Sequence, residues 1–314
     1  MVVSLLLTIL TFVELNCENL FDTEHDTLHQ DTEYLPDSPR HWTRTRYWKK
    51  LDNTARTIIA CGRDSAGWEL PALVALCEVE NDSVVRDLTR RSLLRQAGYE
   101  YVVTSSPDIR GIDVALLYSP FSFGLISSYA LRVEPLADMR PTRDILYACG
   151  RLVNGDTLHV FVVHAPSRYS GERPTRPHRM QVMHRLQVSL DSLRSINPDA
   201  AVVVAGDFND YSDSPSLQFL GEQCGLTNIS AGVSGSNGAK ATYKYQGLWK
   251  SIDHILVSPP MSRRLLDCRV NDAPFLLEDD NKYGGIKPLR TYYGYKFIGG
   301  FSDHLPLVAR FLIQ

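Results

Sequence analysis

The sequence predicts an α/β fold in which two β-sheets pack together with helices on the outside. Short apolar runs rich in Val, Leu and Ala recur along the 314 residues, and segments with helical periodicity separate them. The hairpin signal Asn154-Gly155 stands among these runs, so a uniformly repeating strand–helix unit does not fit. No repeat or shift in composition divides the chain, and we expect a single domain over residues 1–314.

The first elements expected are a core strand and an amphipathic helix. Residues 1–13 are mostly apolar and lead to Asn16, which predicts a first strand; the alternative is the remnant of an export segment. This run is too short to span a membrane. Residues 23–45 are polar and predict a loop, whereas the apolar spacing over 47–60 predicts a helix with one buried face.

Helical periodicity and apolar runs also predict the remaining helices and strands. Helical periodicity predicts helices over 82–97 and 179–196, and loops are expected over 165–177 and 230–241. Apolar runs predict strands over 72–77, 99–104, 114–118, 146–153, 157–163, 200–205, 242–248, 252–257 and 305–313.

The net charge and the cysteine content limit which binding partners and which cellular compartment we expect. Lys and Arg number 33 against 36 Asp and Glu, a net charge of -3, so no global basic field drives nonspecific nucleic-acid binding. The six cysteines form no CxxC pair, which argues against a zinc or redox motif. Reduced core thiols favour a cytoplasmic location over export. We expect a monomer without a membrane span.

Several apolar runs end in polar side chains, which predicts one shared site at a sheet edge. Asp207 and Asn209 follow the run 200–205 and are two residues apart. In an extended chain, side chains two residues apart point to the same side. Taken alone, this segment also fits a strand followed by an Asx turn. The side chains that follow these runs, or precede the last one, are Glu78, His164, Asp207, Asn209, Asp303 and His304.

The oxygen donors favour a hard divalent cation. Glu78, Asp207 and Asp303, with Glu18 as a fourth, suit Mg²⁺ or Mn²⁺ better than zinc. A Mg²⁺ site needs only one or two carboxylates, because the ion keeps water and substrate oxygens.

The histidines and asparagines add acid–base and anion-binding groups. His164 and His304 can each supply a proton or stabilise an anion. Asp253 follows the start of a strand and can pair with its neighbour His254 or with an arginine. Asn16 and Asn209 can donate to phosphate oxygens. Together these groups predict a metal-dependent hydrolase of phosphoesters, in which positioning and charge stabilisation dominate.

Seven short motifs follow one another along nearly the whole chain. They are NCENLFD at 16–22, CEVEN at 77–81, RGIDVALLY at 110–118, HAPSR at 164–168, GDFND at 206–210, SIDHILVS at 251–258 and SDHLPL at 302–307. Their order resembles the endonuclease/exonuclease/phosphatase superfamily, which includes deoxyribonucleases, apurinic endonucleases, inositol-polyphosphate 5-phosphatases and sphingomyelinases. The resemblance implies a four-layer α/β sandwich of two mixed β-sheets packed face to face and flanked by helices.

The resemblance also implies a role for each candidate residue. His304 is similar to the family's catalytic histidine, oriented by Asp253. The metal-side carboxylates that it implies are Glu78, Asp303 and Glu18. The other matches are the water-activating Asp207, its phosphate-binding partner Asn209, the first-strand Asn16 and the phosphate-contacting His164.

The residues leave the substrate class open. A nuclease-like phosphodiesterase is one interpretation, because the basic loop 168–179 and the aromatic and basic stretch 283–297 can form a groove for nucleic acid. The alternative is a phosphatase or phosphodiesterase for a small molecule or lipid headgroup, of the inositol phosphate or sphingomyelin type. Glu80 favours it, since it stands where deoxyribonuclease-like members carry an arginine. The retained carboxylates and histidines argue against a noncatalytic binding domain.

Overall fold

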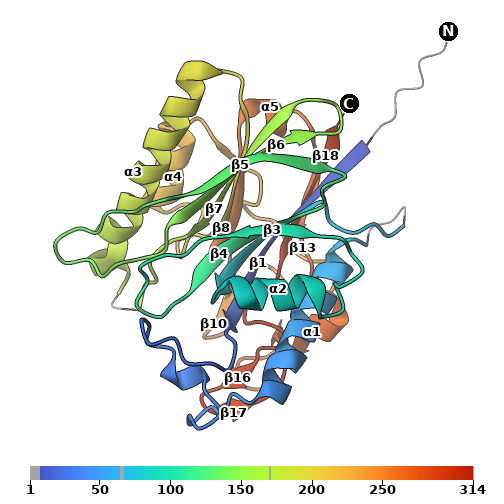
Figure 1. Ribbon diagram of the computed structural model, residues 1–314, viewed down its shortest axis with the longest axis vertical. Coiled ribbons are helices and arrows are strands. Elements are labelled where there is room, and N and C mark those ends of the chain that lie inside the picture. The colour runs from blue at the N-terminus through green and yellow to red at the C-terminus, as the bar shows by residue number, and fades with distance from the viewer. Residues whose placement is uncertain (1–7, 64–66, 170, 314) are drawn as a thin grey trace.

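The computed structural model describes residues 8–63, 67–169 and 171–313 and shows two β-sheets between two layers of helices (Figure 1). The predicted four-layer α/β sandwich is therefore confirmed. The residues 1–7 of the expected first strand lie outside the described part of the chain.

The first large sheet is mixed and has six strands in the order β13-β18-β1-β2-β4-β3. Strands β1 and β2 run parallel, whereas the other neighbours are antiparallel. The strands are β1 (Thr8–Leu20), β2 (Leu73–Val79), β3 (Glu100–Val103), β4 (Asp113–Tyr118), β13 (Leu265–Val270) and β18 (Leu307–Ile313).

The second large sheet has the order β5-β6-β7-β8-β12-β9, with β7 and β8 parallel. The predicted hairpin joins β6 to β7 at Asn154-Gly155, where Gly155 takes a φ of 90°. The strands are β5 (Phe123–Leu131), β6 (Ile145–Leu152), β7 (Thr157–His164), β8 (Ala201–Asp207), β9 (Thr227–Asn228) and β12 (Asp253–Val257).

Helices cover the outer face of each sheet (Figure 1). On the first sheet lie α1 (Arg44–Cys61) and α2 (Asp82–Arg90), and on the second lie α3 (Glu172–Ile196) and α4 (Pro215–Glu222). The short helices are η1 (Thr32–Tyr34), α5 (Pro259–Ser262) and η2 (Pro274–Leu276). No helix in the described part of the chain is long and apolar enough to cross a membrane.

Three small hairpins surround the edge where β1 ends. They are β10 (Tyr243–Tyr245) with β11 (Leu248–Lys250), β14 (Leu277–Asp279) with β15 (Ile286–Pro288), and β16 (Tyr292–Tyr293) with β17 (Lys296–Phe297). They use the segments that the sequence presents as a strand over 242–248 and as a Gly- and Tyr-rich stretch over 281–300.

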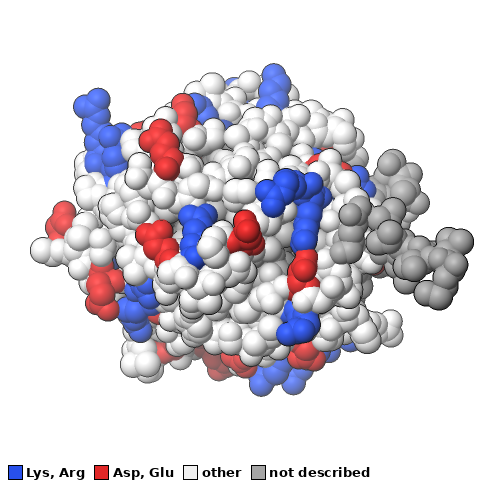
Figure 2. All heavy atoms as spheres, turned by 90° about the horizontal axis from the view of Figure 1, so that it is seen from above, with Lys and Arg blue, Asp and Glu red and all other residues white. Residues whose placement is uncertain are grey.

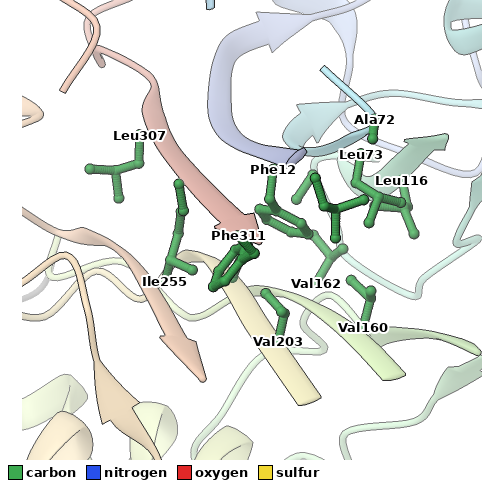
Figure 3. Packing of buried hydrophobic residues seen from close by; sticks show 14 of the residues in the cluster. Phe12, Ala72, Leu73, Leu116, Val160, Val162, Val203, Ile255, Leu307 and Phe311 are labelled. Carbon is green, nitrogen blue, oxygen red and sulfur yellow. The ribbon is translucent and has the colours of Figure 1, made fainter. Parts of the chain in front are cut away.

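The main core lies between the two sheets, where alternate residues of each strand meet. Phe12 and Phe311 of the first sheet face Val160, Val203 and Ile255 of the second (Figure 3). The residues between them in sequence point outward: Val13 of β1, for example, packs in the cluster that includes α1 and α2. Two buried faces per strand explain why these runs are apolar throughout rather than alternating.

Several elements differ from the sequence-based expectation. Helix α2 ends at Arg90 rather than 97, because the chain turns there and the Ser92 hydroxyl bonds back to Leu88 O. Helix α3 begins at Glu172, seven residues early: Pro174 falls in the first turn, whose N–H groups have no helical partner, and Pro177 is accommodated inside the helix in its second turn. The segment 242–248 breaks at Gln246, which has a φ of 48°. Strand β5 and helix α4 carry signals too weak to be predicted.

All six cysteines are free, and five of them are buried, in agreement with reduced core thiols. Burial raises the pKa of Cys61 to about 12 and that of Cys224 to about 11, so these thiols stay protonated at neutral pH.

Candidate active site

The predicted site residues gather where the parallel strands of both sheets end. In the second sheet the register pairs His164 of β7 with Asp207 of β8, and Asp207 with Asp253 of β12. In the first sheet Asn16 pairs with Cys77, next to Glu78. Apolar runs bring each strand through the core, and the polar side chain appears where the run leaves it.

The centre of the site is a histidine held by a buried aspartate. His304 Nδ1 lies 2.9 Å from both carboxylate oxygens of Asp253, which also accepts a hydrogen bond of 2.5 Å from the Thr242 hydroxyl. Burial alone would lower the pKa of His304, but the charge and hydrogen bond of Asp253 raise it well above 6.5. The pair with Asp253 therefore favours the cationic form of His304, and its Nε2 lies 3.9 Å from Asp303 Oδ1.

The neighbour of Asp253 does not form this pair. The His254 Nε2 contacts Asp210 O at 2.9 Å, and burial lowers the pKa of His254 below 6.5. Tertiary contact, and not sequence proximity, selects the partner of Asp253.

Asp207 lies beside this pair and is anchored by two donors. Asn16 Nδ2 donates to its Oδ2 at 3.1 Å, and the backbone N–H of Asn209 donates to its Oδ1 at 2.8 Å. Burial and the charge of Asp253 raise the pKa of Asp207 to about 7. A carboxyl that ionises near neutral pH can accept a proton from water.

His164 faces the same volume as a neutral group. Its Nε2 lies 3.8 Å from Asp207 Oδ2 and 3.9 Å from Glu78 Oε1. Burial, with the nearby cations Arg143 and Arg110, lowers its pKa well below 6.5. Its Nδ1 is buried and has no hydrogen-bond partner among the described residues.

The His164 loop is held by a buried arginine that sequence reasoning did not identify. Arg143 donates to His164 O at 3.2 Å and to Ala165 O at 2.7 Å, and it forms an ion pair of 3.0 Å with Asp108. Asn209 Nδ2 donates to Ala165 O as well, at 3.1 Å. Arg143 lies in a segment without periodicity, so no local signal could have marked it.

Glu78 sits at a break in the regular strand pairing. The register of β2 shifts on both sides, between Asn16 and Leu20 of β1 and between Cys77 and Val79 of β2. The backbone φ is positive at Glu78 (61°), at Glu18 (51°) and at Asn209 (50°), a conformation that costs about 1–3 kcal/mol for such residues. Strained backbone at three predicted site residues is typical of a functional site.

Two of the predicted metal-side carboxylates are bridged by an arginine. Arg290 donates to Glu18 Oε1 at 3.0 Å and to Asp303 Oδ2 at 3.0 Å. The second oxygen of Glu18 accepts the Thr291 N–H at 2.7 Å, and Lys50 Nζ lies 3.9 Å from it. Sequence reasoning placed Arg290 only in a basic and aromatic stretch and missed this contact.

A further acidic side chain lies below the site. Glu14 is fully buried on β1, on the same face as Asn16, and neither of its oxygens has a hydrogen-bond partner among the described residues. Burial, followed by the charges of Asp253 and Asp207, raises its pKa well above 4.5, which favours the protonated acid. Glu14 follows an apolar run in the sequence and was not identified there as a site residue.

The donor set suits a hard divalent cation. Glu78 Oε2 accepts the Asn19 N–H at 2.8 Å, which leaves Oε1 facing the site, and Asp303 has one oxygen not bound to Arg290. Among the described residues, the group of three possible ligands whose atoms lie within 4.8 Å of one another is Asp207, Asp253 and His304. We assign this second cluster to acid–base chemistry, because a cation there would break the 2.9 Å pair of His304 and Asp253.

Comparison with known proteins identifies the family of the chain. The model of the Endonuclease/Exonuclease/phosphatase family matches residues 11–312. A search of curated protein sequences finds no match.

Solved structures share the fold at low sequence identity. An endonuclease/exonuclease/phosphatase family protein from Bacteroides thetaiotaomicron is 13% identical with a TM-score of 0.64, covering 98% of this chain and 99% of its own. A mannosyl-6-phosphatase from the same organism is 15% identical with a TM-score of 0.63, covering 97% of this chain and 100% of its own. TDP2 from C. elegans is 15% identical with a TM-score of 0.59, covering 97% and 75%. With the family model matching nearly all of its length, the chain belongs to the endonuclease/exonuclease/phosphatase family of hydrolases.

Proposed function

We propose that this protein hydrolyses a phosphoester with the help of a bound Mg²⁺ ion, for which Mn²⁺ can substitute. The observation that carries the proposal is the convergence of the cationic His304, the anchored Asp207 and the open oxygen of Glu78 at one end of both sheets. Phosphoryl transfer needs these three elements, because its transition state gains charge on oxygen and leaves little covalent chemistry to the protein.

The residues that would hold the metal are Glu78 and Asp303. In each, one carboxylate oxygen lies 3.9 Å from a histidine Nε2, beyond hydrogen-bond distance, and hard oxygen ligands are those that Mg²⁺ prefers. Glu18 supports the cluster through Arg290, since both of its oxygens already accept hydrogen bonds. When bound, the ion polarises a phosphoryl oxygen and neutralises developing charge.

Asp207 aligns and activates the attacking water. Its pKa of about 7 lets it take one proton as the water oxygen bonds to phosphorus and the bond to the leaving oxygen breaks. The leaving oxygen takes a proton from solvent. Asn16 and the Asn209 backbone keep the carboxylate in one orientation.

His304 and His164 bind the phosphoryl oxygens in different ways. The protonated His304 supplies a charged hydrogen bond from Nε2, because Asp253 occupies Nδ1. His164 is neutral and supplies a hydrogen bond without charge. Fixed donors of this kind offset the charge of the pentavalent transition state.

A nuclease-like phosphodiesterase is a second candidate, supported by cations that stack on tyrosines near the site. The Arg168 guanidinium lies 3.8 Å from the centroid of the Tyr211 ring, and Lys250 Nζ lies 4.5 Å from it. Such pairs can stack bases and contact phosphates of a single strand. The net charge of -3, however, provides no overall basic field that would attract nucleic acid. Figure 2 shows the end of the molecule where β1 begins, away from the site, and basic and acidic side chains are interspersed on that face.

Glu80 does not decide between these candidates. It is buried, accepts the Asp22 N–H at 2.6 Å, and has a pKa raised to about 8 by burial and the charge of Asp22. Its carboxyl therefore holds a loop and presents little negative charge to a substrate.

The test is Mg²⁺-dependent hydrolysis of p-nitrophenyl phosphate, bis-p-nitrophenyl phosphate, plasmid DNA and RNA by the wild type and by His304→Ala. Activity that is lost in the variant supports the proposal. Cleavage of DNA or RNA that weakens steeply as salt rises supports the nuclease-like candidate. Turnover that is the same in His304→Ala, or absent with every metal tried, overturns the proposed function.

A further inference from the structure

A pocket opens beside the predicted metal-side carboxylates and is not used by the chemistry described above. It has a volume of about 270 Å³, just below the range of ~300–1,000 Å³ that is usual for ligand sites. Its walls come from the end of β1, from η1, from the loop before α1 and from β16, and they include Glu18, Asn19, Tyr34, Arg40, Arg290 and Tyr292. Its size suits one compact group.

Two contacts connect the pocket to the reaction centre. The Asn19 N–H donates to Glu78 Oε2 at 2.8 Å. Arg290 binds Glu18 inside the pocket and Asp303, the residue before His304, at 3.0 Å each. A substrate whose phosphoryl group lies beside Glu78 and His304 could therefore place the rest of the molecule in this pocket.

The position of the pocket matches that of a leaving group. Asp207 belongs to the second sheet, whereas the pocket lies at the end of β1 in the first sheet and in the loops outside it. In-line displacement puts the attacking water and the leaving oxygen on opposite sides of phosphorus. With the water on Asp207, the leaving group points away from the second sheet.

The charges of the pocket are already balanced. Arg40 donates to Glu33 at 3.0 Å through Nε and lies 2.9 Å from it through Nη2, and Arg290 is paired with Glu18 and Asp303. No unpaired cation among these side chains is left for a second phosphate. Paired guanidinium and carboxylate groups instead present donors and acceptors side by side, which suits neighbouring hydroxyls.

The pocket also has aromatic walls. The Arg40 guanidinium lies 5.3 Å from the ring centroids of both Tyr34 and Tyr292, which keeps it in place. Tyr34 stacks in turn on Phe21, with centroids 4.2 Å apart. A rigid arginine between tyrosines forms a preorganised polar wall rather than a flexible surface.

We propose that this pocket binds the leaving group of the substrate and that this group is small, uncharged and rich in hydroxyls, as in a sugar or polyol phosphate. The inference rests on the proposed function and adds the chemical class of its substrate. Arg40 is the specificity-determining residue of the pocket.

The experiment compares kcat/KM for three hydroxylated esters (glycerol 3-phosphate, inositol 1-phosphate and glucose 6-phosphate) with that for p-nitrophenyl phosphate. The wild type should prefer one of the three. In Arg40→Ala the ratio of kcat/KM for that ester to kcat/KM for p-nitrophenyl phosphate should fall about tenfold, the effect of one charge-assisted hydrogen bond. The matched control is Arg56→Ala, since Arg56 lies 5.3 and 5.4 Å from the ring centroids of Phe275 and Phe301, outside the pocket.

A binding measurement separates recognition from turnover. In the inactive His304→Ala background, calorimetry should give a weaker affinity for the preferred ester when Arg40 is also replaced by Ala, and an unchanged affinity when Arg56 is. Equal ratios in Arg40→Ala and the wild type would overturn the inference, as would a wild-type preference for glucose 1,6-bisphosphate or a dinucleotide. Failure to hydrolyse p-nitrophenyl phosphate and bis-p-nitrophenyl phosphate would instead refute the proposed function.

Discussion

His304 Nδ1 lies 2.9 Å from both oxygens of Asp253, although 51 positions separate the two residues in sequence. Asp253 is fully buried at the start of β12 in one sheet, and His304 precedes β18 in the other. The contact therefore joins the two sheets as well as fixing the tautomer and charge of the histidine.

Asp253→Asn should lower kcat by about 10²–10⁴-fold, the usual contribution of a positioned acid–base group. The amide keeps the shape of the side chain but removes the charge that raises the pKa of His304. Steady-state kinetics and the thermal melting curve should be measured together. Asp267→Asn, which breaks an ion pair with Arg310 outside the site, is the control and should keep its kcat. Full activity in Asp253→Asn would disprove the role of the pair.

The titration of Asp207 should make a contribution to the stability of the metal-free protein that is lost as the pH rises from about 4 to 7, whereas the lowered pKa values of His164 and His254 act in the opposite direction. The folded pKa of Asp207 is about 7, above the unfolded value near 3.9, so this group binds more protons in the folded state in this interval and its contribution falls as the pH increases. The raised pKa of Glu14 acts in the same direction. Urea unfolding in EDTA should show a flatter dependence on pH for Asp207→Asn. An identical slope in both proteins would contradict this assignment.

Glu14→Leu should raise the free energy of unfolding by about 1–3 kcal/mol, the cost of burying a polar group without a hydrogen bond. The new side chain would lie in the core between the sheets, near Phe12 and Leu307. Glu222→Leu, at the exposed end of α4, serves as the control and should change the stability little. A loss of stability in Glu14→Leu would mean that the carboxyl has a partner, such as an ordered water.

Glu78→Gln should weaken Mn²⁺ binding by at least about tenfold, the effect that loss of even an outer-shell partner causes. Glu80→Gln is a control only two residues away and should keep its affinity, because Glu80 Oε2 is occupied by the Asp22 N–H. Calorimetry or electron paramagnetic resonance would measure both without substrate. Equal affinities in the two variants would exclude Glu78 as a metal ligand.

Gly206→Ala should destabilise the fold by about 3 kcal/mol or more, the sum of overpacking and unfavourable backbone terms. Gly206 has a φ of 144°, and a Cβ there would lie 1.8 Å from Val163 O on the neighbouring strand β7. In Gly124→Ala the Cβ would meet its nearest atom at 3.7 Å, so this control should change the stability by less than about 1 kcal/mol. Denaturant unfolding of both variants would test the difference.

The sequence by itself determined the layered α/β architecture and the strands that carry the site. Strands such as Ala201–Asp207 are apolar on both faces up to their last residue, because one face packs against the other sheet and the opposite face packs against helices. This apolar pattern can be read from the neighbouring residues in the sequence. Polar residues at the ends of those runs, such as Glu78 and His164, could therefore be assigned to one edge before any contact was known.

Only the tertiary structure decided which partners these residues have. Asp253 bonds to His304 and not to the adjacent His254, and Arg290 bridges Glu18 and Asp303 across 272 and 13 positions. Burial of Glu14 beneath the site was equally invisible in the sequence. The physical reason is that side-chain pairing, pKa shifts and pocket shape depend on which strands pack face to face, whereas sequence patterns report only the local period of burial.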